Sequence, residues 1–194
     1  MFISRIKVGL LVAMLISPYS YAQTPGAQIP VDEADLRACL VLEQEGLERF
    51  RALEQKSKDL RASGKLINER SMVLKNQKAK IDPANPNNQA IAKFNEAVSA
   101  FNQQADQFNA EKDGFEKESG DYDNWVKSTL KPTCDKVVNR PVNPVTSYYA
   151  CGFNGAKPLK EVQHCKTVPN LDSLQTCIQK AESKAKAYKI CPQN

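Results

Sequence analysis

The stretch that decides the fold is FNEAVSAFNQQADQFNAEKDGFEKESGDY, residues 94–122, in which five aromatic side chains stand seven residues apart. They are Phe94, Phe101, Phe108, Phe115 and Tyr122. Upstream, five aliphatic residues keep the same step: Leu53, Leu60, Ile67, Leu74 and Ile81. A step of seven returns a residue to the same helix face every two turns, which is typical of paired helices. The two runs therefore predict two long helices that pack against each other.

The segment between the runs, residues 82–88 (DPANPNN), predicts a sharp tip. A residue that precedes proline is disfavoured in the helical region, so the first helix should end near Ile81. Either Asn87 or Asn88 can cap the second helix by accepting a hydrogen bond from its first turn. The prediction is a long antiparallel two-helix coiled-coil hairpin over residues 35–138, with arms of about 65 Å at 1.5 Å per residue.

One register satisfies the side-chain sizes on both arms. If Ile81 faces Ile91, the three aromatic residues Phe101, Phe108 and Phe115 each face a small residue: Ser71, Gly64 and Ser57 respectively. Close packing favours such pairing of large with small side chains. The alternative interpretation of Gly64 is a flexible break, since glycine disfavours a helix.

The same register brings Cys39 opposite Cys134 at the open end, which predicts a disulfide there. Glu43 and Lys78 take positions on the seam between the helices, where polar residues fix the register. Gly114 and Gly120 fall off the seam, so we expect the far part of the second arm to kink or fray.

The first 22 residues have the features of an export signal. Arg5 and Lys7 precede an apolar run over residues 8–16, and small residues follow at 20–22. The run is shorter than the roughly 20 residues that span a bilayer. We expect a signal peptide over 1–22, an extended segment over 23–34, and no transmembrane segment. Removal of the signal takes away two cations and no acid, which lowers the formal charge from +5 to +3.

Six cysteines follow the signal, an even number typical of disulfides in an oxidising compartment. They are Cys39, Cys134, Cys151, Cys165, Cys177 and Cys191. The short signal, together with the lack of any Asn-x-Ser/Thr acceptor in the sequence, favours a bacterial periplasm over the extracellular space.

The tail predicts a small disulfide-stapled subdomain packed on the base of the hairpin. A Pro-rich connector over 139–146 leads to residues 147–194, where a short strand over 147–151 and a helix over 171–189 are expected. Asn170 or Asp172 is the expected cap of that helix. The predicted fold class is mainly α, with an α subdomain that includes a short β segment.

The expected helix over 171–189 constrains the tail disulfides. Cys177 and Cys191 would lie about 20 Å apart along a continuous helix, whereas disulfide-bonded residues need Cα atoms within about 7 Å. This favours the nested pairs Cys151–Cys191 and Cys165–Cys177 slightly over the crossed pairs Cys151–Cys177 and Cys165–Cys191.

No arrangement of residues typical of catalysis, cofactor binding or metal binding is found in the sequence. His164 beside Cys165 is interpreted as an ordinary surface histidine, because a catalytic triad needs three placed groups. The basic residues are not clustered with aromatic ones, so nucleic-acid binding is not expected. We expect no catalytic, cofactor or metal site.

The tip has the only features that suggest a partner contact. Lys75, Lys80 and Lys93 give a local excess of positive charge, and Met72 and Val73 flank the seam and should point outward. The competing interpretation is a solvated end with a stray apolar pair.

The main hypothesis is an exported, non-enzymatic binding or scaffold protein that presents its hairpin to a macromolecule, either a protein or an anionic envelope surface. The alternative is a self-assembling structural protein, a homo-oligomer that uses the hairpin as a bundle interface. An enzyme of unknown class is a third hypothesis.

Overall fold

A computed structural model describes residues 29–82 and 87–192 of the chain. The expected signal peptide over 1–22 lies outside the described residues, as do residues 23–28 of the expected extended segment and residues 83–86 of the tip. The described part is mainly helical and contains no strand. Among these residues, no helix combines the length and apolar character that a membrane span requires.

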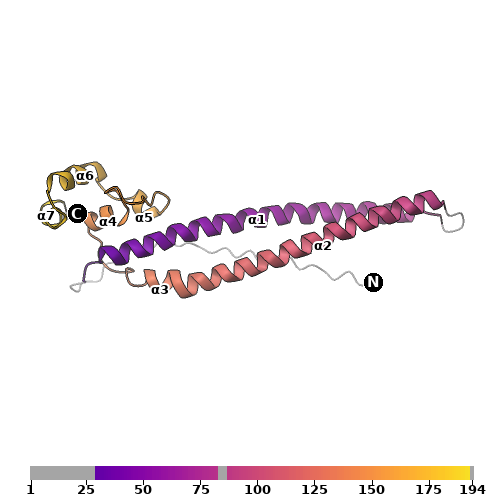
Figure 1. The fold of residues 1–194 in the computed structure, drawn as a ribbon, viewed down its shortest axis with the longest axis horizontal. Helices are drawn as coiled ribbons and strands as arrows, with labels where there is room; N and C mark the ends of the chain where they lie inside the picture. The colour runs from indigo at the N-terminus through magenta and orange to yellow at the C-terminus, as the bar shows by residue number, and fades with distance from the viewer. Residues whose placement is uncertain (1–28, 83–86, 193–194) are drawn as a thin grey trace.

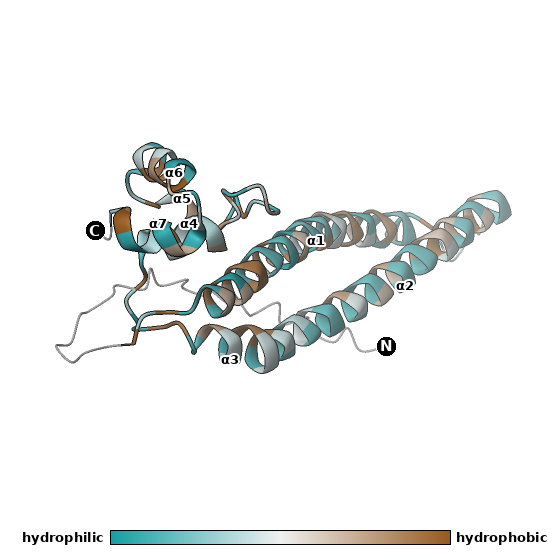
Figure 2. Ribbon diagram, turned by 60° about the vertical axis from the view of Figure 1, so that its left-hand side comes forward, coloured by the Kyte–Doolittle hydropathy of each residue, from teal (hydrophilic) through white to brown (hydrophobic). Residues whose placement is uncertain are grey.

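Two long antiparallel helices form a rod, with a small subdomain at one end (Figure 1). The first is α1 (Glu33–Ala79) and the second is α2 (Asn88–Trp125). At 1.5 Å per residue, α1 is about 70 Å long. Figure 2 shows hydrophobic and hydrophilic segments alternating along both helices. The predicted hairpin is confirmed.

Both helices begin with side-chain caps that the sequence supplies. Asp32 accepts a hydrogen bond from the backbone N–H of Ala34 at 2.8 Å, at the start of α1. Asn87 accepts from the N–H groups of Gln89 and Ala90 at 3.0 and 3.2 Å, which makes it the cap of α2. Such caps satisfy donors that have no partner inside the helix.

The seam between the helices follows the heptad pattern. All ten heptad residues named above are half-buried. A Cβ atom added at Gly64 would lie 3.3 Å from Cζ of Phe108, so these two residues meet as the predicted register requires. Gly64 lies inside a continuous helix, and the flexible break at this position is not observed. Ser71 and Lys78 are exposed, so the seam excludes these two predicted members.

The second arm becomes irregular close to the base rather than at its glycines. α2 runs through Gly114 and Gly120 without a break and is followed by the π-helical turn η1 (Val126–Leu130) and by α3 (Lys131–Cys134). Pro132 lies just after η1. Its ring removes one helical hydrogen bond and clashes with the carbonyl four residues back, which explains the wider turn.

The subdomain consists of four short helices. They are α4 (Pro144–Ala150), α5 (Gln163–Lys166), α6 (Leu171–Lys180) and α7 (Lys184–Ile190). The strand predicted over 147–151 is wrong, because those residues lie largely in α4. Asn143 caps this helix by accepting from the N–H of Val145 at 2.8 Å, and Pro144 occupies the first helical position, where proline is well tolerated.

The disulfide that was predicted from the hairpin register is confirmed, whereas both predicted pairings of the tail cysteines are wrong. Cys39 is bonded to Cys134, with their Cα atoms 4.8 Å apart. The tail contains Cys151–Cys165 and Cys177–Cys191 instead of the nested or crossed pairs.

The reason is a break in the predicted final helix. Glu182, with φ of 56°, adopts a left-handed conformation between α6 and α7. Ser183 then caps α7 by accepting from the N–H of Lys186 at 3.2 Å. The chain turns back, and the Cα atoms of Cys177 and Cys191 come within 5.7 Å. At the start of α6, Asn170 is the N-cap residue but makes no side-chain capping hydrogen bond.

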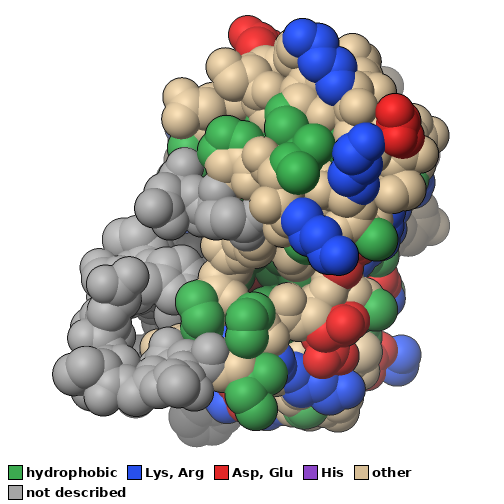
Figure 3. Space-filling model, turned by 90° about the vertical axis from the view of Figure 1, so that its left-hand side faces the viewer, with side chains coloured by type: hydrophobic (Ala, Val, Ile, Leu, Met, Phe, Trp, Pro, Cys, Tyr) green, Lys and Arg blue, Asp and Glu red, His purple; other side chains and the backbone are tan. Residues whose placement is uncertain are grey.

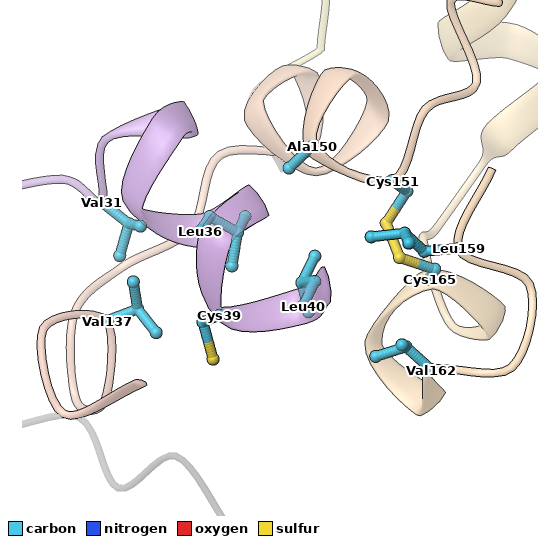
Figure 4. Close-up of a cluster of buried hydrophobic side chains, with 10 residues drawn as sticks. All are labelled: Val31, Leu36, Cys39, Leu40, Val137, Ala150, Cys151, Leu159, Val162 and Cys165. Atoms are coloured by element: carbon cyan, nitrogen blue, oxygen red, sulfur yellow. A yellow bond between two sulfur atoms is a disulfide. The ribbon is translucent and has the colours of Figure 1, made fainter. Parts of the chain in front are cut away.

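The subdomain packs on the base of the hairpin through a buried apolar cluster. Figure 4 shows Leu36 and Leu40 of α1 facing Ala150 and the Cys151–Cys165 disulfide. Polar contacts add to this junction, since the Arg37 guanidinium donates to the carbonyl oxygens of Ala150 and Lys157 at 2.6 and 3.1 Å. The base is therefore the part of the molecule with a true core.

Candidate interaction surface

Among the described residues, the large exposed apolar side chains of the far half of the hairpin all belong to α1. Leu66 is 65% exposed, Met72 is 61% exposed and Val73 is 52% exposed. Single exposed apolar side chains are ordinary on a protein surface, but neighbouring ones are typical of a binding site. Leu66 and Val73 lie one heptad apart, on one face of the helix.

These two residues border a groove of about 490 Å³ between α1 and α2. Phe108, from the seam, is also part of its lining. The remaining lining is mostly polar: Ser63, Glu69 and Arg70 of α1 with Gln104, Gln107 and Glu111 of α2, besides Ile67. The Arg70 guanidinium donates to Oε1 of Gln104, which connects the two helices. An apolar strip with a polar border is the usual composition of a protein-binding surface.

The residues predicted to contact a partner separate into two groups. Val73 lines the groove, whereas Met72 is exposed outside its lining. Lys75, Lys80 and Lys93 are exposed near the tip and are not among the groove residues. The sequence reasoning missed Leu66, although its position seven residues before Val73 is a usable signal.

At the opposite end of the seam, Glu43 lies beside the Cys39–Cys134 disulfide. One carboxylate oxygen of Glu43 and the two sulfur atoms all lie within 4.8 Å of one another. Three such groups could hold a metal ion only with reduced cysteines, since the thiolate is the ligand form. The sulfur atoms are bonded to each other here, which leaves Glu43 as a carboxyl group in a largely apolar setting.

Burial raises the pKa of Glu43 above its ordinary value of 4.5. The unfolded chain therefore ionises at a lower pH than the folded protein. Between the two pKa values the native state binds more protons, so stability falls as the pH rises through that window and stays lower above it.

Replacing Glu43 by glutamine should remove this loss. We expect a higher melting temperature for Glu43→Gln than for the unsubstituted protein at pH 7, and a smaller difference at pH 4. Thermal denaturation at pH 7 and at pH 4, followed by circular dichroism, measures the two melting temperatures. Glu48→Gln, at an exposed position on the same helix, is the matched control and should change little. An equal gain at both pH values would contradict the burial argument.

His164 is half-buried and hydrogen-bonded, rather than the ordinary surface histidine that the sequence suggested. Its Nε2 lies 2.9 Å from Oγ of Ser147, and burial lowers the pKa of its imidazole. Ser147 is only 5% exposed. A serine nucleophile must reach its substrate, and this one is covered by the subdomain's own atoms. The hydrogen bond between Ser147 and His164 gives each side chain a polar partner inside the base.

The end of the molecule at the base presents a different surface from the far half of α1. In the end-on view, Lys and Arg side chains alternate with small, separate groups of hydrophobic side chains (Figure 3). A polar network joins the subdomain to the start of α1, where Tyr188 donates to Glu33 at 3.1 Å and Lys184 forms an ion pair with the same carboxylate. These contacts hold the two parts together.

No protein-family model, no curated protein and no solved structure matches this chain.

Proposed function

We propose that this protein is an exported, non-enzymatic binding protein whose hairpin carries a protein-binding surface on the far half of α1. The observation that carries the proposal is the position of Leu66, Met72 and Val73, which are exposed beside or near a groove. At the base of the same helix, in contrast, Leu36 and Leu40 are buried under the subdomain, although Val41 and Phe50 are 41% and 38% exposed. Three disulfides support an oxidising, exported environment. Within it, the compartment we propose is a bacterial periplasm.

The rest of the molecule suits this task. The base, closed by the Cys39–Cys134 disulfide and covered by the subdomain, holds the two helices together at one end. A rod of about 70 Å then carries the apolar strip away from the base. Burying a side chain of this kind against a partner contributes roughly 1.5–3 kcal/mol, before the entropy lost on association is subtracted.

A capture experiment tests the proposal. The mature protein is immobilised through its C-terminus and exposed to periplasmic extract from the producing cell, and the retained proteins are identified by mass spectrometry. We expect the variant Met72→Gln/Val73→Gln to lose the specific partner. Ile190→Gln, which changes an exposed apolar residue of the subdomain, is the control and should retain it. Equal retention by all three proteins would contradict the proposal.

The lysines near the tip should assist an anionic partner. Replacing Lys75, Lys80 and Lys93 by glutamine should weaken binding several-fold at low salt and much less at high salt, because salt screens exposed charges. The melting temperature should hardly change, since exposed charges contribute little to stability. Titration of the captured partner at two ionic strengths measures the effect. An unchanged affinity at low salt would show that the tip is not part of the binding surface.

The alternative function, a self-assembling structural protein, is favoured by one pattern on α1. Leu66 and Val73 lie symmetrically on either side of Glu69 and Arg70.

A further inference from the structure

We infer that the protein partner that occupies the groove is a second copy of this chain, with the two α1 helices packed antiparallel about a two-fold axis. The inference rests on the proposed function, because it names the occupant of the same surface. A two-fold interface uses one patch on both copies, so the patch must be complementary to itself. The far half of α1 meets this requirement.

The complementary residues form a stripe of heptad positions: Asp59, Leu66, Val73 and Lys80. Each of them directly precedes a seam residue, so the stripe is rotated by about 100° from the seam and remains outside the hairpin. Leu66 and Val73 are mostly exposed, as quoted above, and Asp59 and Lys80 are exposed at its two ends.

Antiparallel packing centred between Glu69 and Arg70 pairs every member of this stripe with a suitable residue. Leu66 then faces Val73 of the second copy, and Asp59 faces Lys80 of the second copy. At the centre, Glu69 faces Arg70. By symmetry each of these contacts occurs twice. At each of these positions, apolar residues meet apolar ones and acids meet bases.

Neighbouring registers lack this match. Sliding one copy by seven residues in one direction places Asp59 opposite Val73. Sliding it by seven in the other direction places Leu66 opposite Lys80. Both shifts bury a charge against an apolar side chain, which is unfavourable without a partner for the charge. The residues therefore specify one register.

The groove offers space for the approaching helix. Leu66 and Val73 line it together with Phe108, so the α1 helix of the second copy would contact both arms of the hairpin. The charged residues already make local contacts, since Arg70 donates to Gln104 and Asp59 accepts from Gln55 at 3.0 Å. These are exposed hydrogen bonds, which exchange for other polar contacts at little cost.

Charge reversal and rescue test the inference. Analytical ultracentrifugation of the mature protein over a range of concentrations should show a monomer–dimer equilibrium. Glu69→Arg should raise the dimer dissociation constant roughly tenfold or more, because the introduced guanidinium of each copy then faces Arg70 of the other. The double variant Glu69→Arg/Arg70→Glu should restore the dimer, since the two charges are exchanged and remain complementary.

Two further variants test the apolar contact. Leu66→Glu should dissociate the dimer, whereas Met72→Glu, at a similarly exposed residue off the stripe, should leave it intact. A photo-crosslinking amino acid at position 66 should label the second copy near Val73. Circular dichroism and melting temperature establish that each variant is folded.

A monomer at all concentrations, or a dimer that Glu69→Arg and Leu66→Glu leave unchanged, would overturn the inference. The capture experiment tests the proposed function separately from the dimer. If the protein is monomeric but Met72→Gln/Val73→Gln still loses a different captured protein, the second copy is excluded and the binding surface stands. If that variant loses nothing as well, both are excluded.

Discussion

Removing the Cys39–Cys134 disulfide with the double variant Cys39→Ala/Cys134→Ala should lower the free energy of unfolding by about 4–5 kcal/mol. The crosslink spans 95 residues, and closing a long loop removes more conformational entropy from the unfolded chain than closing a short one. The disulfide also closes the open end of the hairpin, where α1 meets α3. Urea denaturation followed by circular dichroism at 222 nm measures the loss.

A matched control is present in the same chain. The Cys151–Cys165 disulfide spans only 14 residues, so Cys151→Ala/Cys165→Ala should lower the free energy of unfolding by about 3 kcal/mol. Both double variants remove two cysteines and make the same substitution. A smaller loss from the long crosslink than from the short one would show that chain entropy does not account for the hairpin's stability.

Replacing Gly64 by leucine should destabilise the hairpin by about 1–3 kcal/mol, because the seam has no room for the side chain. Even a Cβ atom at this position would lie 3.3 and 3.5 Å from two ring carbons of Phe108. Gly120→Leu should have the opposite effect and stabilise by up to about 1 kcal/mol through helix propensity. No atom lies within 4 Å of a Cβ placed at Gly120. Melting temperatures of the two variants give the comparison.

A second substitution shows whether Phe108 is the cause. In the Phe108→Ala background the ring is gone, and Gly64→Leu should then be much less harmful or even favourable. The double-mutant cycle isolates this coupling, because both residues contact each other directly. If Gly64→Leu destabilises equally with and without the ring, the pairing of glycine with phenylalanine is wrong.

The hairpin was predictable because its determinants repeat. Large residues at heptad steps indicate which face of each helix is buried. The position of Gly64 opposite Phe108 indicates how the two helices are aligned. The Cys39–Cys134 disulfide followed from that register without separate assumptions. Local signals also sufficed at the tip, where Asn87 caps α2 by a short-range hydrogen bond.

The subdomain was less predictable because its helix ends depend on tertiary contacts. Residues 171–189 have continuous helical spacing, yet the chain turns between α6 and α7 at Glu182. Ala181, beside this turn, is completely buried, so packing rather than propensity determines where the helix ends. The strand predicted over 147–151 was wrong for a local reason instead, because Asn143 and Pro144 start a helix whose signal the aromatic and polar side chains that follow do not override.

The interaction surface was predictable only in part. The outward position of Met72 and Val73 follows from the seam, because residues beside a narrow apolar stripe must face away from it. Leu66 precedes the seam residue Ile67 just as Val73 precedes Leu74, so the same argument applied one heptad earlier would have found it. The groove itself depends on how the two helices and their side chains are spaced, which no pattern along one helix contains.

The connectivity of the three disulfides has a consequence for how the chain matures after export. Along the sequence, the cysteines are bonded in consecutive pairs: Cys39 to Cys134, Cys151 to Cys165 and Cys177 to Cys191. A chain that crosses a membrane N-terminus first exposes its cysteines in this same order. Each newly arrived pair is then a native pair, so an oxidant that joins thiols as they emerge produces the correct bonds without reshuffling. Maturation should therefore require an enzyme that forms disulfides and be independent of one that isomerises them.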